Sequence, residues 1–288
     1  MIKFENTVTP SAEQWKAIIM GCRNPLNSWH LMDSFLCTEG TMTNEEIEAT
    51  CGKCTKKDCC DIYDEEPHFI IGPNDYDLMK RLRNAGTDHR KFMRMITVYV
   101  DITAPLYWWK EFDTYKVATV ANSCSTMHKI HAKEFTLEDF SCEHLFGPDD
   151  MLDYDERVDP AKDNALAAVN VDGEWCYFTP QGYIQMTSNI LNHYRELYLN
   201  CEAKLKRTDL TDAERKHVSA QKKKYWWQMI QLLPSSYNQK RTVLLNYEVL
   251  ANMYKSRRLH KLNEWRELCA WIETLPYHEL ITGEFKED

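Results

Sequence analysis

The segment LPSSYNQKRTVLLNYEVLANMYKSR, from Leu233 to Arg257, is the most informative stretch of the chain. It opens with a Leu-Pro pair. Asn246 lies twelve residues after Pro234, Asn252 follows six residues later, and Arg257 comes five residues after that. Polar residues at such fixed distances from a Leu-Pro pair make this segment the first candidate for a functional site.

Local patterns predict a strand followed by a helix in this segment. Residues 242–245, Thr-Val-Leu-Leu, are β-prone, as a buried strand requires, and residues 248–258 are rich in helix formers. Asn246 is therefore predicted to lie at a strand-to-helix junction.

The helix leaves two interpretations open for Arg257. Leu250, Met253 and Tyr254 lie at positions i, i+3 and i+4, so the next position of the apolar stripe, i+7, is Arg257. An arginine there either extends to solvent past the helix end or turns inward to meet an anion.

Composition limits the class of protein. The chain has 288 residues, 43% of them hydrophobic, which is enough for a sizeable core. Its net charge of -9 argues against a general binder of nucleic acid or membrane surfaces, because polyanions are held by clustered Lys and Arg. We expect a cytoplasmic protein without a signal peptide or membrane span. The odd number of cysteines, 11, favours reduced thiols over a disulfide framework.

Periodicity outside this segment predicts an α+β fold. One half-buried strand is expected from Met95 to Thr103 because apolar and polar residues alternate there. Seven helices are predicted outside the segment. They begin at Thr9-Pro10, Thr43, Asn74, Pro105, Thr179-Pro180, Thr211 and near Leu262, and the one from Asn74 ends at Gly86. Four of them have an apolar stripe, formed in chain order by Trp15, Ile18, Ile19 and Cys22; by Trp108, Phe112 and Tyr115; by Tyr183, Ile190, Tyr194 and Leu197; and by Trp265, Cys269 and Ile272. The helices that begin at Thr179 and Thr211 should pack as an antiparallel hairpin.

Two segments look like insertions in a single domain of residues 1–288. The first is Cys-rich and covers residues 37–66, and the second is acidic and covers residues 134–177, with a possible strand from Trp175 to Phe178. Within the first, Cys51, Cys54, Cys59 and Cys60 cluster, with Cys37 upstream. Four thiols could hold a zinc ion in tetrahedral coordination. The second Cys-x-x-Cys that such sites usually have is missing, so a redox role and reduced thiols without a metal are alternative interpretations of this cluster.

A second polar segment follows the predicted strand. Residues 114–127 read TYKVATVANSCSTM, and residues 86–92, just before the strand, read GTDHRKF. A solvated helix face is the plain explanation of Lys116 and its neighbouring lysines. The paired tryptophans 108–109 and 226–227 fit core or interface positions better than a stacking platform.

These segments together resemble the flavin-dependent thymidylate synthases, also called thymidylate synthase complementing proteins. The Leu-Pro, Asn, Asn and Arg spacing is similar to the family's C-terminal core. Residues 114–127 lie where the family has Arg-His-Arg-x-x-Ser-x-Asn-x-x-Ser-x-Arg-Tyr; Lys116 keeps a positive charge and Thr119 a hydroxyl, while Thr114 and Tyr115 replace Arg and His. Glu111 stands where the family has Gln, and Glu248 where it has Arg.

The resemblance implies a fold, a reaction and a set of site residues. The fold would be a small antiparallel sheet with a long helical hairpin and further helices, assembled as a homotetramer. The reaction would convert dUMP to dTMP with FAD, methylenetetrahydrofolate and NADPH. Implied as catalytic are Arg257, Ser125 and Cys124; as cofactor-binding His89, Tyr115, Lys116, Thr119, Asn246 and Asn252; and as substrate-binding Glu111, Lys116, Ser125 and Arg257.

Two other functions compete with this one. The losses at Thr114, Tyr115 and Thr126 favour a divergent homologue that binds flavin or nucleotide, and that modifies another pyrimidine or has no catalytic activity. The cysteine cluster instead favours a zinc-dependent interaction module, which leaves the C-terminal half unexplained. Flavin absorbance of the purified protein separates the first two functions from the third.

Overall fold

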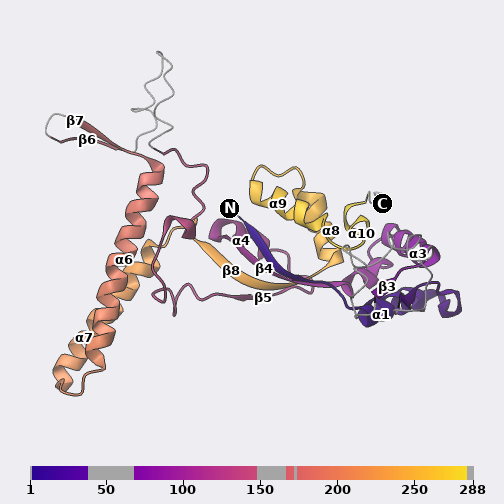
Figure 1. The fold of residues 1–288 in the computed structure, drawn as a ribbon, viewed down its shortest axis with the longest axis horizontal. Helices are drawn as coiled ribbons and strands as arrows, with labels where there is room; N and C mark the ends of the chain where they lie inside the picture. Colours follow the sequence, from indigo (N-terminus) through magenta and orange to yellow (C-terminus); the bar gives the residue numbers. More distant parts are fainter. Residues whose placement is uncertain (1, 38–67, 148–166, 172–173, 284–288) are drawn as a thin grey trace, which may run out of the picture. The chain divides into compact units, whose positions relative to one another are not determined.

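The computed structural model describes residues 2–37, 68–147, 167–171 and 174–283 (Figure 1). The strands are β1 Lys3–Val8, β2 Phe35–Cys37, β3 His68–Ile70, β4 Thr97–Pro105, β5 Val120–Ser123, β6 Ala167–Val171, β7 Glu174–Phe178 and β8 Asn238–Asn246. The α-helices are α1 Ala12–Arg23, α3 Pro73–Asn84, α4 Leu106–Phe112, α6 Pro180–Leu205, α7 Asp212–Leu232, α8 Tyr247–Arg257, α9 Asn263–Ile272 and α10 Glu279–Thr282. Short 3-10 turns are η1 Asn24–Leu26, η2 Trp29–Leu31, η3 Arg90–Arg94 and η4 Leu137–Asp139. This mixture of helices and strands confirms the predicted α+β class.

A small antiparallel sheet, with strands in the order β1-β4-β8-β5, is the largest sheet of the described residues. Strand β4 confirms the alternation predicted for this region: Val98, Val100 and Ile102 are buried, while Tyr99 between them is exposed. Because successive side chains of a strand point to opposite faces, one face of β4 carries the core.

The chain divides into two compact units. The first contains residues 103–110 and 123–240, and the second contains residues 2–102, 111–122 and 241–288. Strands β4, β5 and β8 contribute residues to both units, and each unit is described by itself. The predicted single domain with insertions at 37–66 and 134–177 stays a prediction.

In the second unit, helix α1 buries the stripe that the sequence predicts. Trp15, Ile18, Ile19 and Cys22 are all buried. The proline does not lie in the first turn, however. Ser11 caps the helix, and its side chain and that of Gln14 accept hydrogen bonds from each other's backbone N–H groups. This capping box satisfies two N–H groups that would otherwise lack partners, so the helix begins after Pro10.

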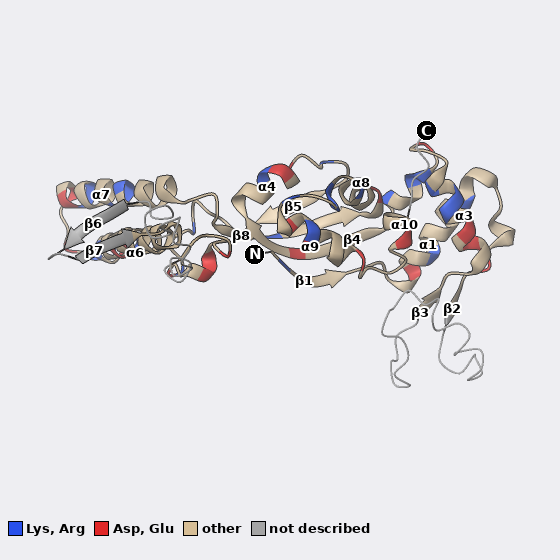
Figure 2. Ribbon diagram, turned by 90° about the horizontal axis from the view of Figure 1, so that it is seen from above, with Lys and Arg blue, Asp and Glu red and all other residues tan. Residues whose placement is uncertain are grey.

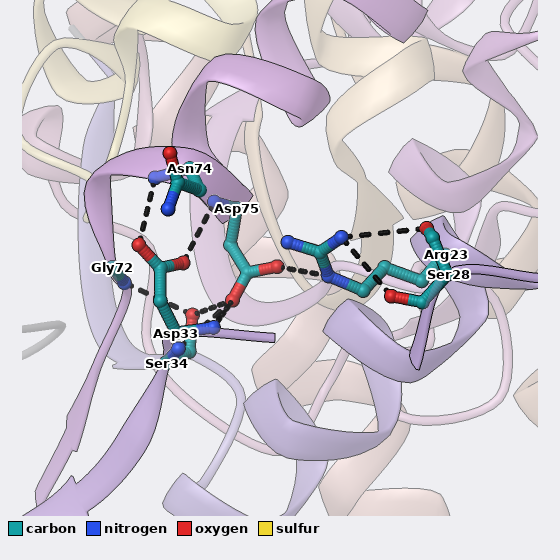
Figure 3. Close-up of polar contacts among 7 residues, drawn as sticks. All are labelled: Arg23, Ser28, Asp33, Ser34, Gly72, Asn74 and Asp75. Carbon is teal, nitrogen blue, oxygen red and sulfur yellow. Dashed lines mark hydrogen bonds and ion pairs between the residues drawn. The ribbon is translucent and has the colours of Figure 1, made fainter. Parts of the chain in front are cut away.

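A buried ion pair joins α1 to α3 (Figure 3). Arg23 Nε lies 2.5 Å from Asp75 Oδ1, and Arg23 also donates to the backbone oxygen of Ser28. Asp75 Oδ2 accepts from the backbone N–H groups of Asp33 and Ser34 and from the Ser34 hydroxyl. Every charge in this network therefore has partners, as burial requires.

The first unit contains the predicted helical hairpin. Helices α6 and α7 run side by side (Figure 1), and Thr211 with Glu214 forms the predicted capping box at the start of α7. Figure 2 shows Lys and Arg along α7, which contains Lys222, Lys223 and Lys224. In Figure 1, β6 and β7 form a short hairpin whose second strand matches the strand predicted from Trp175.

The predicted apolar stripe of α6 is confirmed in part. Tyr194 packs against the core of the unit, and Ile190 and Leu197 are half-buried. Tyr183 is exposed, however, and the fully buried apolar residues of this part of the helix are Ile184 and Leu191. The reason is polar: Asn192 donates to the backbone oxygen of Phe135 and accepts from its backbone N–H, both at 2.8 Å, and Ser188 donates to the same oxygen. These bonds fasten residues 130–140 to this face, where Ile184, Leu191, Phe135, Phe140, Ile130 and Met229 form the core of the unit.

Within the described residues, no helix combines the length and the apolar character needed to cross a bilayer.

Candidate functional site

Arg257 lies inside a polar and aromatic cluster of the second unit. It is the last residue of α8, and its side chain is only 18% exposed. Its Nε donates to the Tyr115 hydroxyl at 2.9 Å, and its Nη2 lies 2.6 Å from Glu111 Oε1. Of the two interpretations that the sequence left open, the structure favours the inward one, and the anion is a carboxylate of the same chain.

Two aromatic rings hold the guanidinium of Arg257. Its Cζ lies 4.9 Å from the centroid of the Trp265 ring and 5.7 Å from that of Tyr115. The two rings are 6.0 Å apart. An arginine over an aromatic face gains electrostatic attraction and keeps its planar group in one orientation. The rings therefore fix the direction in which Arg257 presents its remaining N–H groups.

Glu111 is engaged on both oxygens. Oε1 pairs with Arg257, and Oε2 accepts the indole N–H of Trp265 at 3.2 Å. The side chain of Glu111 is 37% exposed, about twice the exposed fraction of Arg257. Of this ion pair, Glu111 is therefore the more exposed partner. The cluster of Glu111, Tyr115, Arg257 and Trp265 is called the Arg257 cluster below.

The predicted strand-to-helix junction is confirmed at Asn246. This residue is 1% exposed, and its Oδ1 accepts from the backbone N–H of Val249 at 3.0 Å, which caps α8. Its Nδ2 donates to the backbone oxygens of Val117 and Ala118. Ala118 has a positive φ of 54°, a conformation that costs energy for a residue with a Cβ. Asn246 therefore holds the loop after Tyr115 in place, and its contact with a cofactor stays a prediction.

A second ionic cluster lies at the start of α8. Glu248 is 3% exposed and pairs with Arg94 and, at 3.5 Å, with Arg90. Its hydrogen bond and charge raise the pKa of Arg94. Both arginines come from η3, so both are paired with a carboxylate of the protein itself.

The other predicted cofactor residues of this unit lie at the surface or hold the backbone. His89 is exposed in a turn, where its backbone N–H donates to Gly86. Lys116 and Asn252 are exposed. Thr119 donates its hydroxyl to the backbone oxygen of Tyr115 at 2.7 Å. The structure thus brings Tyr115, Glu111 and Arg257 together, and the cofactor roles of the remaining residues stay predictions.

The two predicted catalytic residues of the 114–127 segment belong to the first unit. Cys124 is exposed, and its backbone pairs with β8: its N–H donates to Lys240 and its oxygen accepts from Gln239. The Ser125 hydroxyl accepts from the backbone N–H of His128 at 2.9 Å, which stabilises a turn. The predicted roles of both residues are untested by these contacts.

The predicted zinc ligands Cys51, Cys54, Cys59 and Cys60 lie outside the described residues. Among the residues that are described, no group of three or more His, Cys, Asp or Glu side chains is arranged to hold a metal. The helix predicted from Thr43 also lies outside the described ranges.

Sequence reasoning missed Trp265 as a member of the Arg257 cluster. It placed Trp265 on the apolar stripe of the last helix, where the side chain is indeed fully buried. The indole N–H, which needs an acceptor when buried, was the available signal. It also did not pair Glu248 with Arg90 and Arg94, although Glu248 had been noted at a position where the family has Arg.

Comparisons with known proteins gave structural likeness only. No protein-family model and no curated protein matches the sequence. Two solved structures of the flavin-dependent thymidylate synthase ThyX from Helicobacter pylori, both with FAD and dUMP, are similar at 14% identity and a TM-score of 0.47; the alignments cover 98–99% of this chain and 96–99% of theirs. A UMP/dUMP methylase, PolB from Streptomyces cacaoi, bound with 5-Br dUMP, aligns at 12% identity and a TM-score of 0.41, covering 98% and 94% of the two chains. With TM-scores below 0.5, these likenesses carry no argument about function.

Proposed function

We propose that this chain is a divergent protein of the flavin-dependent thymidylate synthase type, which binds a uracil nucleotide beside FAD and methylates the pyrimidine. The finer form of the proposal is conversion of dUMP to dTMP with methylenetetrahydrofolate and NADPH, in a homotetramer. One observation carries it. Arg257, which aligns with the family's arginine by its spacing from the Leu-Pro pair, is held inward beside Glu111, which aligns with the family's pyrimidine-reading position.

The cluster has the chemistry that a pyrimidine ring needs. A guanidinium fixed between two rings donates to carbonyl oxygens, and it stabilises negative charge that develops on them during reaction. Because the side chain is already ordered by Tyr115 and Trp265, little rotamer entropy is lost when a ligand binds. Preorganised donors of this kind are how proteins assist chemistry that a cofactor carries out.

This chain has fewer hydrogen-bond donors to hold FAD than the motif of the family has. Lys116 offers a single ammonium in place of a guanidinium fork, and Asn252 offers an exposed amide on α8. Both suit a phosphate or a ring carbonyl, whereas the amide of Asn246 is occupied by backbone groups. When bound, reduced flavin supplies hydride. We therefore expect FAD to bind saturably but more weakly than is typical for the family.

The test measures binding first and reaction second. The apo-protein is titrated with FAD and with dUMP, and thymidylate formation is then assayed and checked by complementation of a thymidine auxotroph. Saturable binding of both ligands supports the proposal. Absence of FAD binding at high micromolar concentration contradicts it.

The residue-level test is Arg257→Leu with Arg258→Leu as its matched control. Arg258 is the next residue and is exposed. Loss of a charge-assisted contact from a sheltered site should weaken dUMP binding about 30-fold or more, while the melting temperature stays near that of wild type. The control should bind dUMP normally. Equal affinity of a folded Arg257→Leu variant and wild type removes Arg257 from the site.

A second candidate is a nucleotide-binding homologue without thymidylate synthase activity. It is favoured by Tyr115, whose hydroxyl accepts from Arg257 at a position where the family has histidine. Binding of FAD and dUMP without thymidylate formation would select it.

A further inference from the structure

Helix α7 has no acidic side chain after Glu214, and the rest of the helix, residues 215–232, contains five Lys and Arg. The contrast with the remaining chain is large. Residues 180–232 contain nine Lys and Arg against five Asp and Glu, which leaves 26 of the chain's 35 basic residues and 39 of its 44 acidic residues for all other positions. The net charge of -9 therefore hides a basic region, part of which Figure 2 shows along α7.

Two of the five basic residues are engaged within the hairpin. Arg215 donates to two backbone oxygens near the turn between α6 and α7, and Lys222 lies 3.0 Å from Glu202 Oε1. The other three are exposed and have no hydrogen-bond or ion-pair partner among the described residues; they are Lys216, Lys223 and Lys224. Their charges are therefore available to a partner molecule.

The three lysines lie on one face of the helix. At 3.6 residues per turn, they fall within an arc of about 100° that also contains Ala220 and Trp227, and this arc is opposite Met229, the buried residue of α7. The arc extends about 17 Å along the helix axis from the first lysine to the tryptophan. It is called the α7 basic face below and consists of Lys216, Ala220, Lys223, Lys224 and Trp227.

Trp227 adds a fixed aromatic surface to the α7 basic face. Its side chain is 42% exposed, and its ring meets that of Trp226 edge-on, with the centroids 4.8 Å apart and an interplanar angle of 64°. Trp226 is in turn held by its indole N–H, which donates to the backbone oxygen of Met127 at 2.8 Å. A braced ring that stays partly uncovered is suited to stacking on a flat ligand.

We propose that the α7 basic face binds single-stranded nucleic acid, with its lysines on the phosphates and a base stacked on Trp227. Lysines without counterions attract a polyanionic backbone and release its condensed cations on binding. Stacking on an aromatic ring accepts any base, so the binding is sequence-tolerant and salt-dependent. The inference goes beyond the proposed function, which rests on the Arg257 cluster of the second unit, whereas α7 belongs to the first.

Other occupants fit the α7 basic face less well. A second copy packed on the same face by twofold symmetry would set lysine against lysine. An anionic membrane needs several apolar side chains beside the lysines, and Trp227 is the one large apolar residue of this face. An acidic polypeptide would pair with the lysines but would have no base to stack on the ring. One exposed lysine alone indicates little, so the inference depends on the row together with the ring.

The experiment measures binding of labelled oligoadenylate, as RNA and as DNA of about 20 nucleotides, to the full chain by fluorescence anisotropy. Excess dUMP and FAD are present, so the proposed nucleotide site does not contribute. We expect a micromolar Kd at about 50 mM salt, and an association constant that falls with salt at a log-log slope of about -2 for three phosphate contacts. No binding at high micromolar protein overturns the inference and leaves the proposed function untouched.

Two variants test the residues of the α7 basic face. Lys223→Glu combined with Lys224→Glu should weaken binding about tenfold or more, and Trp227→Ala should weaken it about fivefold or more. The matched control is Lys16→Glu combined with Lys261→Glu, which makes the same charge change at exposed lysines of the second unit. The control should bind like wild type. Equal losses in both double variants, or unchanged affinity in the α7 double variant, would assign the binding elsewhere.

Two further measurements decide the class of partner and the place of binding. Displacement of the oligoadenylate by polyglutamate, with Trp227→Ala binding as tightly as wild type, would assign the face to acidic polypeptides and overturn the inference. Photocrosslinking of oligoadenylate to wild type needs no variant. The crosslinked peptides should contain Trp227, and crosslinks confined to other peptides contradict the inference even where a variant fails to fold.

Discussion

Helix α8 and the hairpin of α6 and α7 are stabilised in different ways. α8 has 11 residues, and six of them are buried. α6 has 26 residues with five buried, and α7 has 21 with only Met229 buried. On a helix with many buried positions, the polar side chains that are buried must find partners, whereas a helix that packs along one stripe leaves its charges in water.

This difference tells which charges are informative about function. In the second unit, Glu248 and Arg257 have fixed partners and small exposed fractions. In the hairpin unit, the ion pair of Arg207 and Asp209 is 61% and 64% exposed, and such pairs contribute little to stability. A charged residue is thus a stronger functional candidate on α8 than on α7.

The largest expected contrast is between a buried and an exposed ion pair. Asp75→Ala leaves Arg23 buried without its counterion, so it should lower the free energy of unfolding by about 3–5 kcal/mol. Asp209→Ala, which removes a largely exposed carboxylate, should leave the unfolding midpoint nearly unchanged. Urea denaturation followed by circular dichroism measures both. Equal midpoints for the two variants would break the distinction between the units.

A smaller contrast is expected between two helix caps. Asn246→Ala should cost about 2 kcal/mol, the upper end for a cap, because the same amide also holds the oxygens of Val117 and Ala118. Thr211→Ala, at the exposed start of α7, should cost about 1 kcal/mol or less. Thermal melts of the two variants give the comparison. A cost at Thr211 as large as that at Asn246 would contradict it.

The smallest effect concerns a histidine of the hairpin unit. Burial lowers the pKa of His131, whose Nδ1 is enclosed without a hydrogen-bond partner among the described residues. In the unfolded chain the pKa of a histidine is about 6.5, so below this pH the unfolded chain binds a proton at His131 more readily than the folded protein does. The free energy of unfolding should therefore decrease as the pH falls from 6.5 toward the lower pKa of the folded protein.

The matched variants for this effect are His131→Asn and His217→Asn. His217 is exposed on α7. Melting temperatures between pH 7.5 and 5 should fall less steeply for His131→Asn than for wild type, while His217→Asn should follow wild type. An unchanged slope in His131→Asn would show that this histidine titrates alike in both states.

The spacing of apolar residues predicted those helices and strands whose buried face is made of apolar side chains at the helical or strand period. The α1 stripe, the β4 alternation and the strand that precedes α8 were predicted because apolar side chains at the right spacing need one buried face. The buried face of α6 was predicted only in part, because Ser188 and Asn192, which bind the backbone of Phe135, also lie on it. A helix pattern counts apolar residues only, so it cannot register polar side chains that recruit another segment.

The residues of the candidate site also differ in whether local sequence spacing could predict their positions. The sequence by itself determined that Arg257 interrupts an apolar stripe and that Asn246 lies at a junction, since both follow from local spacing. Only the tertiary structure decided that Glu111 and Trp265 meet Arg257, because Glu111 and Arg257 lie 146 positions apart in the sequence and no local rule joins them. Ion pairs between distant residues depend on the packing of whole elements, and that packing is a property of the folded chain.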